Sequence, residues 1–217
     1  MTVMYKGLIK RAMDLCFAII IIPFVILAIA ILAPFIYAED HGSILYVAER
    51  LGKDGRRFRM IKLRSMQMNA PDIRNEDGST FNASDDGRVT GIGRLLRKTS
   101  LDEVPQVFNV LRGDMSFVGP RPNLMTMPFE RLSAPEKKRV RVRPGITGYN
   151  QAYFRNAASA KQKYENDCYY VDNVSFMLDT KIMLRTLMTV LRRENINSDE
   201  TPSHGIGGPN KTHETNV

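Results

Sequence analysis

Two adjacent carboxylates, Asp102 and Glu103, have the sequence surroundings that most strongly indicate chemistry. Guanidinium and ammonium groups bind phosphate oxygens, and Pro120 and Pro122 fix the backbone on both sides of Arg121. The cations expected to bind phosphate are Lys62, Arg64, Arg94, Arg97, Lys98, Arg112, Arg121 and Arg143. A carboxylate among such cations should stay ionised and can attack phosphorus. The neighbouring carboxylate can hold Mg²⁺ together with substrate phosphates, so Asp102 and Glu103 are both candidate catalytic and metal-binding residues.

A structural role for the same pair is also open. Ser100 and Glu103 have the spacing of a capping box at a helix start, and acidic residues suit the first turn of a helix. Pro105 opposes that register, because proline fits best at the first helical position. A helix beginning near Val104 would leave Asp102 and Glu103 just ahead of it, with free side chains.

Composition narrows the function classes. The net charge of +8 suits anionic lipids, phosphorylated substrates or nucleic acid. The basic residues are not interleaved with a stacking platform, and no helix-turn-helix or RNP pattern is present, so no nucleic acid partner is expected. The three histidines lie too far apart for a zinc site, and there is no P-loop sequence. Cys16 and Cys168 do not indicate a disulfide framework, which favours a reducing compartment.

An uncharged apolar run at residues 15–38 indicates a membrane element. As a helix it would be about 36 Å long at about 1.5 Å per residue, enough to cross a bilayer. It is longer than the apolar core of a signal peptide, about 7–15 residues, so cleavage is not expected.

The charges around this run favour a re-entrant helix over a straight span. Lys6, Lys10 and Arg11 precede it, and residues 50–59 carry further basic side chains, so both flanks prefer the cytoplasm. Pro23 should bend the helix, and two arms at residues 13–22 and 24–37 could enter and leave the same leaflet. A Pro-kinked span is the alternative.

The rest of the chain predicts an α/β fold that is mostly helical with little strand. Domain boundaries are expected at 1–38 for the membrane helix, 39–194 for one cytoplasmic catalytic domain and 195–217 for a polar, disordered tail. Residues 57–66 form a candidate strand, 69–87 a loop, and 116–122 and 143–148 irregular segments and turns. Helices are expected at 92–98, from about 104 to Gly113, at 137–141 after a Ser133–Glu136 capping box, at 157–171, and from Ser175 to about 193.

The last of these helices carries an apolar stripe, and two interpretations of it are open. The stripe consists of Leu178, Ile182, Leu187, Val190 and Leu191. It could face the core, or the helix could lie among lipid headgroups.

Five segments in this order resemble the bacterial sugar transferase family, the small monotopic phosphoglycosyl transferases. They are KRAMDLCFAIIIIP, RLGKDGRRFRMIKLRSM, RVTGIGRLLRKTSLDEVPQVFNVLRGDMSFVGPRP, VRPGITGYNQ and YENDCYYVDNVSFMLDTKI. The resemblance covers about residues 10–192, and the block 99–122 is its most specific part. Three positions depart from the family pattern: Ile22 stands where Ser often precedes the bending proline, and Tyr149 and Val174 stand where Trp is common.

The resemblance implies transfer of a phospho-sugar from a UDP-sugar to undecaprenyl phosphate, releasing UMP, as the first membrane step of surface-glycan synthesis. Asp102 would form a covalent phospho-sugar intermediate, and Glu103 would assist through Mg²⁺. Lys62, Arg97, Arg121 and Asp167 match functional positions of the family and are expected to contact substrate. The resemblance also implies a re-entrant helix in the bacterial inner membrane and allows a homodimer.

Two other functions compete with this one. An ordinary glycosyltransferase would transfer the sugar alone and release UDP. A non-catalytic membrane scaffold would use the basic face only to bind anionic lipid. The sequence does not name the sugar.

Overall fold

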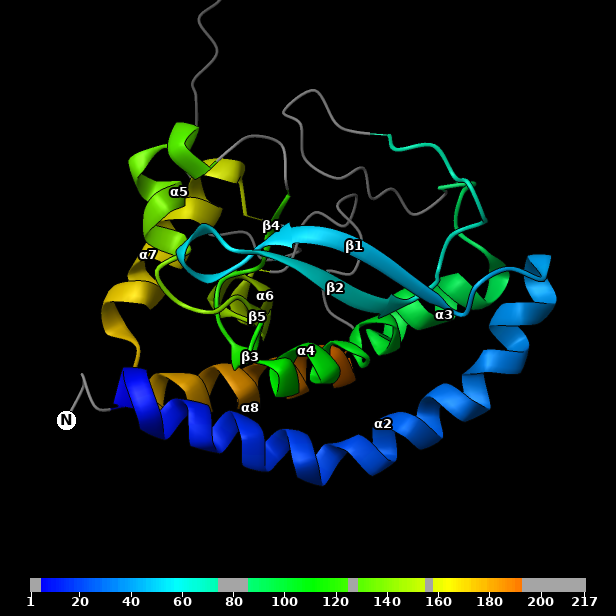
Figure 1. Cartoon of the computed structure of the whole chain (residues 1–217), viewed down its shortest axis with the longest axis horizontal. Coiled ribbons are helices and arrows are strands. Elements are labelled where there is room, and N and C mark those ends of the chain that lie inside the picture. The colour runs from blue at the N-terminus through cyan, green and yellow to red at the C-terminus, as the bar shows by residue number, and fades with distance from the viewer. Residues whose placement is uncertain (1–4, 74–85, 125–128, 155–157, 193–217) are drawn as a thin grey trace, which may run out of the picture.

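The computed structural model describes residues 5–73, 86–124, 129–154 and 158–192. It confirms a mostly helical chain with two small sheets (Figure 1). The predicted tail and most of the predicted 69–87 loop lie outside the described residues, as do the side chains of Val190 and Leu191.

The apolar run forms one long helix, α2 (Lys10–Asp40), after a π-helical turn, η1 (Tyr5–Ile9). Pro23 and Pro34 lie inside α2, so the predicted division into two arms at Pro23 is wrong. A proline removes one backbone hydrogen bond and tilts the axis, but the flanking hydrogen bonds still continue the helix. The result is a curved helix whose concave side faces α4 (Gln106–Arg112) (Figure 1).

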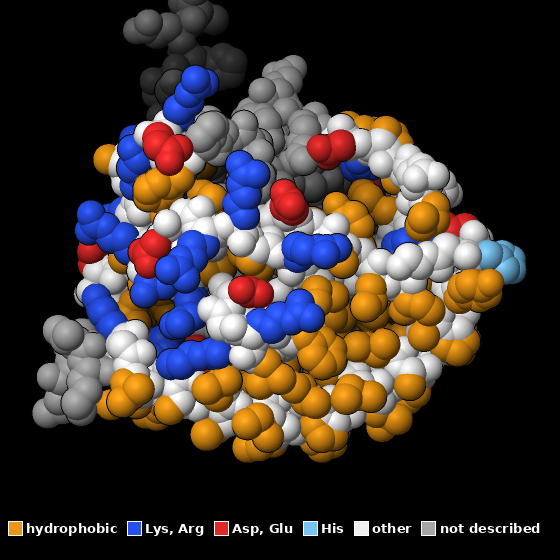
Figure 2. Space-filling view, viewed as in Figure 1, with side chains coloured by type: hydrophobic (Ala, Val, Ile, Leu, Met, Phe, Trp, Pro, Cys, Tyr) orange, Lys and Arg blue, Asp and Glu red, His pale blue; other side chains and the backbone are white. Residues whose placement is uncertain are grey.

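The concave side of α2 is part of the protein core. Ala18 and Val25 pack with Val107 and Val110 of α4, and Ile36 packs in a second cluster with residues from the globular part. The outer side of α2 is apolar and exposed, and it follows the lower edge of the molecule in Figure 2. Its large exposed side chains include Ile19, Ile20, Phe24, Leu27, Ile31 and Phe35. By length and composition, residues 5–40 could cross a membrane.

A β-hairpin lies above α4. Strand β2 (Arg57–Leu63) confirms the predicted strand, and β1 (Leu45–Leu51), which the turn-rich sequence did not predict, pairs with it antiparallel. The short 3₁₀ helix η2 (Lys53–Gly55) joins them, and β4 (Asn123–Leu124) pairs with the other edge of β1. The buried side chains Phe58, Met60 and Leu63 hold this sheet on the core.

A second sheet consists of two short parallel strands, β3 (Ser116–Val118) and β5 (Gly145–Thr147). The predictions of an irregular segment at 116–122 and a turn at 143–148 are therefore wrong for these residues. Glycine is needed where the backbone just after β3 meets β5, since a Cβ at Gly145 would lie 2.1 Å from the Gly119 nitrogen. Such short strands carry too few side chains to show an alternating pattern in the sequence.

The remaining helices largely follow the predictions. They are α3 (Gly91–Thr99), α5 (Ala134–Arg139), α6 (Tyr149–Tyr153), α7 (Ala160–Asn173) and α8 (Phe176–Arg192), with a 3₁₀ turn η4 (Phe129–Arg131). Neither α6 nor η4 was predicted. The Ser133–Glu136 capping box is present, although α5 begins earlier than expected, and the Ser175 side chain accepts a hydrogen bond from the Leu178 N–H at the start of α8.

Helix α8 has both a core side and an exposed apolar side. Ile182 is fully buried, and Leu178 packs beside it. Leu187, predicted to belong to the core stripe, is instead 58% exposed, because the side of α8 that packs on the body is narrower than the stripe. Other exposed apolar side chains of α8 are Phe176, Met177, Leu184 and Met188. The core-facing interpretation is therefore confirmed for Ile182 and Leu178, and the position of the exposed side among lipid headgroups stays a prediction.

Candidate active site

The carboxylate pair lies in a tight connection between α3 and α4. Ser100 has left-handed backbone angles (φ 58°) and ends α3, and a 3₁₀ turn, η3 (Leu101–Glu103), carries Asp102 and Glu103. In the described part of the chain, the Ser100 side chain makes no capping hydrogen bond at the start of η3. The predicted alternative of a Ser100–Glu103 capping box is therefore wrong. Helix α4 begins at Gln106 rather than near Val104, and the pair lies ahead of it as predicted.

Two cations from distant segments meet at Glu103. The Lys62 Nζ of β2 donates to Glu103 Oε1 at 2.7 Å, and a guanidinium nitrogen of Arg121 lies 3.6 Å from the same oxygen. The Lys62 side chain is 14% exposed, whereas that of Arg121 is 59% exposed and open to a ligand. The structure thus brings together four predicted site residues from three segments.

Asp102 occupies a different environment from its neighbour. Burial raises the pKa of its carboxyl above the ordinary value, although Lys62, Arg121 and Arg97 act in the opposite direction, and the adjacent Glu103 raises it further. The surrounding cations favour the ionised form of Asp102, as expected, but burial of the carboxyl acts against them and raises its pKa. Arg97, on α3, is partly buried, and this desolvation lowers the pKa of its guanidinium. Its Nε donates to Ser65 Oγ at 3.1 Å.

The residues present suit a magnesium ion that is shared with a substrate. In the described part of the chain, no three His, Cys, Asp or Glu residues gather into a complete metal site. Mg²⁺, however, is commonly bound by one or two carboxylates together with substrate phosphates and water. Asp102 and Glu103 supply that donor set, and Glu103 is partly exposed.

Three other predicted site residues make contacts away from the carboxylate pair. Arg64 is buried and pairs with Asp40 at the end of α2, where it also donates to the Ile36 carbonyl at 3.0 Å. The Nε of Arg143 donates to the Gly113 carbonyl, at the C-terminus of α4. Both residues therefore join elements of the fold in this structure.

Asp167 is buried on α7 and is bonded to other protein side chains. It forms an ion pair with Arg139 at 2.7 Å and accepts a hydrogen bond from Asn150 Nδ2 at 2.9 Å. Burial raises its pKa, and Arg139 acts against that shift.

Asn109 is a site residue that the sequence reasoning missed. It is fully buried on α4, its Oδ1 accepts from the Ile61 N–H at 3.0 Å, and its Nδ2 donates to the Arg59 carbonyl at 2.7 Å. These bonds fix α4, which follows the carboxylate pair, to the strand that carries Lys62. An asparagine inside an apolar helical stripe was the available signal.

Comparison with known proteins gives one consistent result. The family model described as bacterial sugar transferase matches residues 5–193. A UDP-N-acetylgalactosamine-undecaprenyl-phosphate N-acetylgalactosaminephosphotransferase of Aeromonas hydrophila is 40% identical over 84% of this chain and 44% of its own length. A UDP-galactose-lipid carrier transferase of Erwinia amylovora is 38% identical over 85% of this chain and 41% of its own. An uncharacterised sugar transferase of Bacillus subtilis, EpsL, is 39% identical over 87% of this chain and 90% of its own length.

The chain therefore spans less than half the length of the first two relatives, but nearly the whole of EpsL. The match includes α2 as well as the carboxylate pair and its cations. This chain belongs to the bacterial sugar transferase family.

Proposed function

We propose that this protein transfers a phospho-sugar from a UDP-sugar to undecaprenyl phosphate and so begins the synthesis of a bacterial surface glycan. The products are undecaprenyl-diphosphate sugar and UMP. The main support is the juxtaposition of Asp102 with a Glu103 that Lys62 and Arg121 hold, in a chain of this family. The names of two relatives specify UDP-sugar and lipid-carrier chemistry.

The proposed reaction has two displacements at one phosphorus atom. A carboxylate oxygen of Asp102 attacks the sugar-bearing phosphorus, the bond from that phosphorus to the bridging oxygen breaks, and UMP leaves with that oxygen. A phosphate oxygen of the lipid then attacks the same phosphorus, and the Asp102 oxygen leaves.

The surrounding residues serve these displacements in different ways. Arg121 and Lys62 offset negative charge on the phosphates, and Arg97 favours the ionised form of Asp102. When Mg²⁺ is bound by Asp102 and Glu103, it supplies further neutralisation of the phosphate charge.

The proposal extends to the position of the enzyme in the membrane. Both ends of α2 contact the same globular part. Arg11 donates to the Val110 carbonyl at 2.6 Å and Asp14 accepts from the Phe117 N–H at 3.2 Å, while Asp40 at the far end pairs with Arg64. A helix with both ends on one body cannot place them on opposite sides of a bilayer. We therefore propose that α2 is re-entrant, in the bacterial inner membrane, with the catalytic domain facing the cytoplasm.

Nucleotide release tests the proposed reaction. Protein in nanodiscs receives Mg²⁺, undecaprenyl phosphate and one of a panel of UDP-sugars, with wild type compared to Asp102→Asn. We expect UMP from one sugar and a loss of at least about 10³-fold in the variant, because the nucleophile is absent. Asp54→Asn, an exposed aspartate in η2, is the matched control and should keep wild-type turnover.

A donor-only reaction tests the covalent step. With labelled UDP-sugar and no lipid, the phospho-sugar mass should appear on the peptide that contains Asp102, and not in Asp102→Asn. Release of UDP would instead support an ordinary glycosyltransferase. If no sugar nucleotide of the panel turned over while anionic vesicles were bound, the scaffold function would be supported.

A further inference from the structure

The segment Pro120–Pro122, which carries Arg121, is held by hydrogen bonds to its backbone carbonyls. Neither proline has an N–H, so backbone carbonyls are its main anchoring groups. The Pro120 carbonyl accepts from the N–H of Gly145, the first residue of β5, at 2.9 Å. The Arg121 carbonyl accepts from a guanidinium nitrogen of Arg139 at 3.1 Å. A side chain on α5 therefore holds the residue whose own side chain reaches Glu103.

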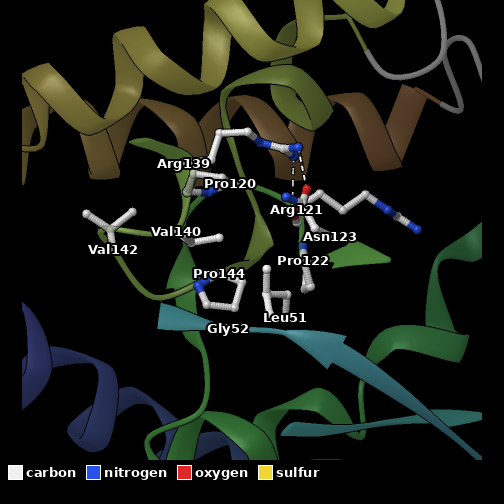
Figure 3. Close-up of a pocket in the computed structure, with 10 residues that line it drawn as sticks. All are labelled: Leu51, Gly52, Pro120, Arg121, Pro122, Asn123, Arg139, Val140, Val142 and Pro144. Atoms are coloured by element: carbon white, nitrogen blue, oxygen red, sulfur yellow. Dashed lines mark hydrogen bonds between the residues drawn. The ribbon is translucent and has the colours of Figure 1, made fainter. Parts of the chain in front are cut away.

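Arg139 makes several contacts at once. Besides the Arg121 carbonyl, its guanidinium donates to Asn123 Oδ1, and these two bonds are drawn in Figure 3. It also pairs with Asp167 at 2.7 Å and lies over the Tyr164 ring, 4.9 Å from its centre. The Arg139 side chain is only 11% exposed. A planar, multiply bonded guanidinium of this kind is fixed in place, unlike a flexible surface arginine.

Asp167 acts within the same network. It is 2% exposed, and both of its oxygens accept hydrogen bonds, Oδ2 from Arg139 and Oδ1 from Asn150. A buried carboxylate so bonded is placed to orient Arg139. The hollow beside this network, lined by Pro120, Pro144 and Leu51 among others, has a volume of about 10 Å³, which is at most the space of one water molecule. In this structure the hollow is too small to hold a sugar nucleotide.

We propose that Arg139, oriented by Asp167, is a positioning residue that fixes the backbone from which Arg121 extends to the active site. Arg121 is long and 59% exposed, so its reach toward Glu103 depends on where its backbone is held. In Figure 3 its side chain points away from Arg139 and the hollow. What Arg121 binds, a donor phosphate, rests on the proposed function. The part assigned to Asp167 differs from the substrate contact expected from the family resemblance.

A double-mutant cycle tests this coupling. Arg139→Lys keeps the charge near Asp167 but loses the planar fork, and we expect kcat/KM for the UDP-sugar to fall about 10- to 100-fold, mainly through KM. In an Arg121→Ala background, the same change should cost no more than about twofold, because its effect acts through Arg121. Asp167→Asn should behave in the same way. Arg141→Lys, on the exposed arginine two residues further on, is the matched control and should change nothing.

The outcomes separate this inference from the proposed function. Equal losses from Arg139→Lys in both backgrounds, with unchanged stability, would overturn the positioning role. If Arg121→Ala kept full turnover, the donor-phosphate role of Arg121 would be wrong.

A second measurement does not depend on activity. Hydrogen exchange of the peptide covering residues 119–123 should become at least about tenfold faster in Arg139→Lys and Asp167→Asn, while α8 peptides keep their wild-type rates. Unchanged exchange at 119–123 would show that Arg139 does not hold this backbone segment. That conclusion would stand whatever reaction the protein catalyses.

Discussion

At the scale of single residues, the neighbouring carboxylates of Asp102 and Glu103 lie in different environments. Asp102 is desolvated and its pKa is raised, whereas Glu103 accepts from Lys62 and lies near Arg121. Different surroundings can give different chemical roles to two carboxyl groups that have similar pKa values in water. In the proposed reaction Asp102 is the nucleophile, and Glu103 binds cations.

The raised pKa of Asp102 predicts a stability cost that increases with pH. The folded state binds this proton more tightly than the unfolded state, so stability falls as pH rises from the unfolded pKa through the raised folded pKa. Asp102→Asn lacks this cost. Thermal unfolding without Mg²⁺ should show equal Tm values for the two proteins in acid and a higher Tm for the variant at neutral pH. A variant less stable than wild type at neutral pH would contradict this.

Lys62 is predicted to influence both carboxylates. It bonds Glu103, and among the cations it has the largest effect in lowering the pKa of Asp102. Lys62→Met should reduce kcat/KM about 100-fold and move the acid side of the pH–rate profile to higher pH. Lys53→Met, at an exposed lysine, is the control. A profile that kept its position would show that Lys62 does not act on the ionisation of Asp102.

At the scale of elements, the site depends on how α4 is fixed to β2. The bonds from Asn109 join the two at Ile61 and Arg59, and Arg11 of α2 donates to carbonyls at the end of α4. The short turn η3 therefore lies between elements that are each anchored. This arrangement lets a connection of three residues hold a reactive carboxylate in one place.

Asn109→Ala should weaken this docking. It leaves the Ile61 N–H and the Arg59 carbonyl without their side-chain partner, at a cost of about 1–3 kcal/mol for each buried group. Chemical denaturation should report a loss of about 2–4 kcal/mol, and kcat should fall because Lys62 and Glu103 lose their relative position. Asn173→Ala, which removes one exposed hydrogen bond, is the control and should change stability by less than about 0.5 kcal/mol. A loss no larger than in this control would mean that Asn109 does not carry the docking.

At the scale of the whole molecule, the exposed apolar surface follows the outer side of α2 and one side of α8. Lys10 on α2 pairs with Asp179 on α8 at 2.6 Å, and Tyr5 donates to the same carboxylate. The two helices are therefore held together as parts of one body, and Figure 1 shows α8 running beside the N-terminal half of α2. A body that carries the carboxylate pair and an apolar helix bound at both ends suits chemistry at the level of lipid headgroups.

Cysteine labelling should test the membrane arrangement. With Cys16 and Cys168 replaced by Ser, single cysteines at positions 2 and 217 are exposed to a membrane-impermeant reagent in intact cells. We expect protection of both until the cells are opened, because the proposed re-entrant helix would leave both ends in the cytoplasm. Labelling of only one in intact cells would show a span and contradict the re-entrant arrangement.

The sequence by itself determined the long apolar helix, most other helices, strand β2, the carboxylate pair and two of its cations, Lys62 and Arg121. These features rest on local signals: an apolar run, helical periodicity, capping residues and adjacent charged side chains. The resemblance to a family also came from contiguous motifs. Nothing in these signals requires knowledge of distant contacts.

Only the tertiary structure decided which cations reach the pair and which hold the fold. Arg64 and Arg143 look like Lys62 in the sequence, yet one pairs with Asp40 and the other supports the end of α4. The sequence also gave no sign that Arg139 and Asp167 would meet behind Arg121, or that burial would raise the pKa of Asp102. The physical reason is that burial and ion pairing depend on side chains far apart in the chain, which only the folded arrangement brings into contact.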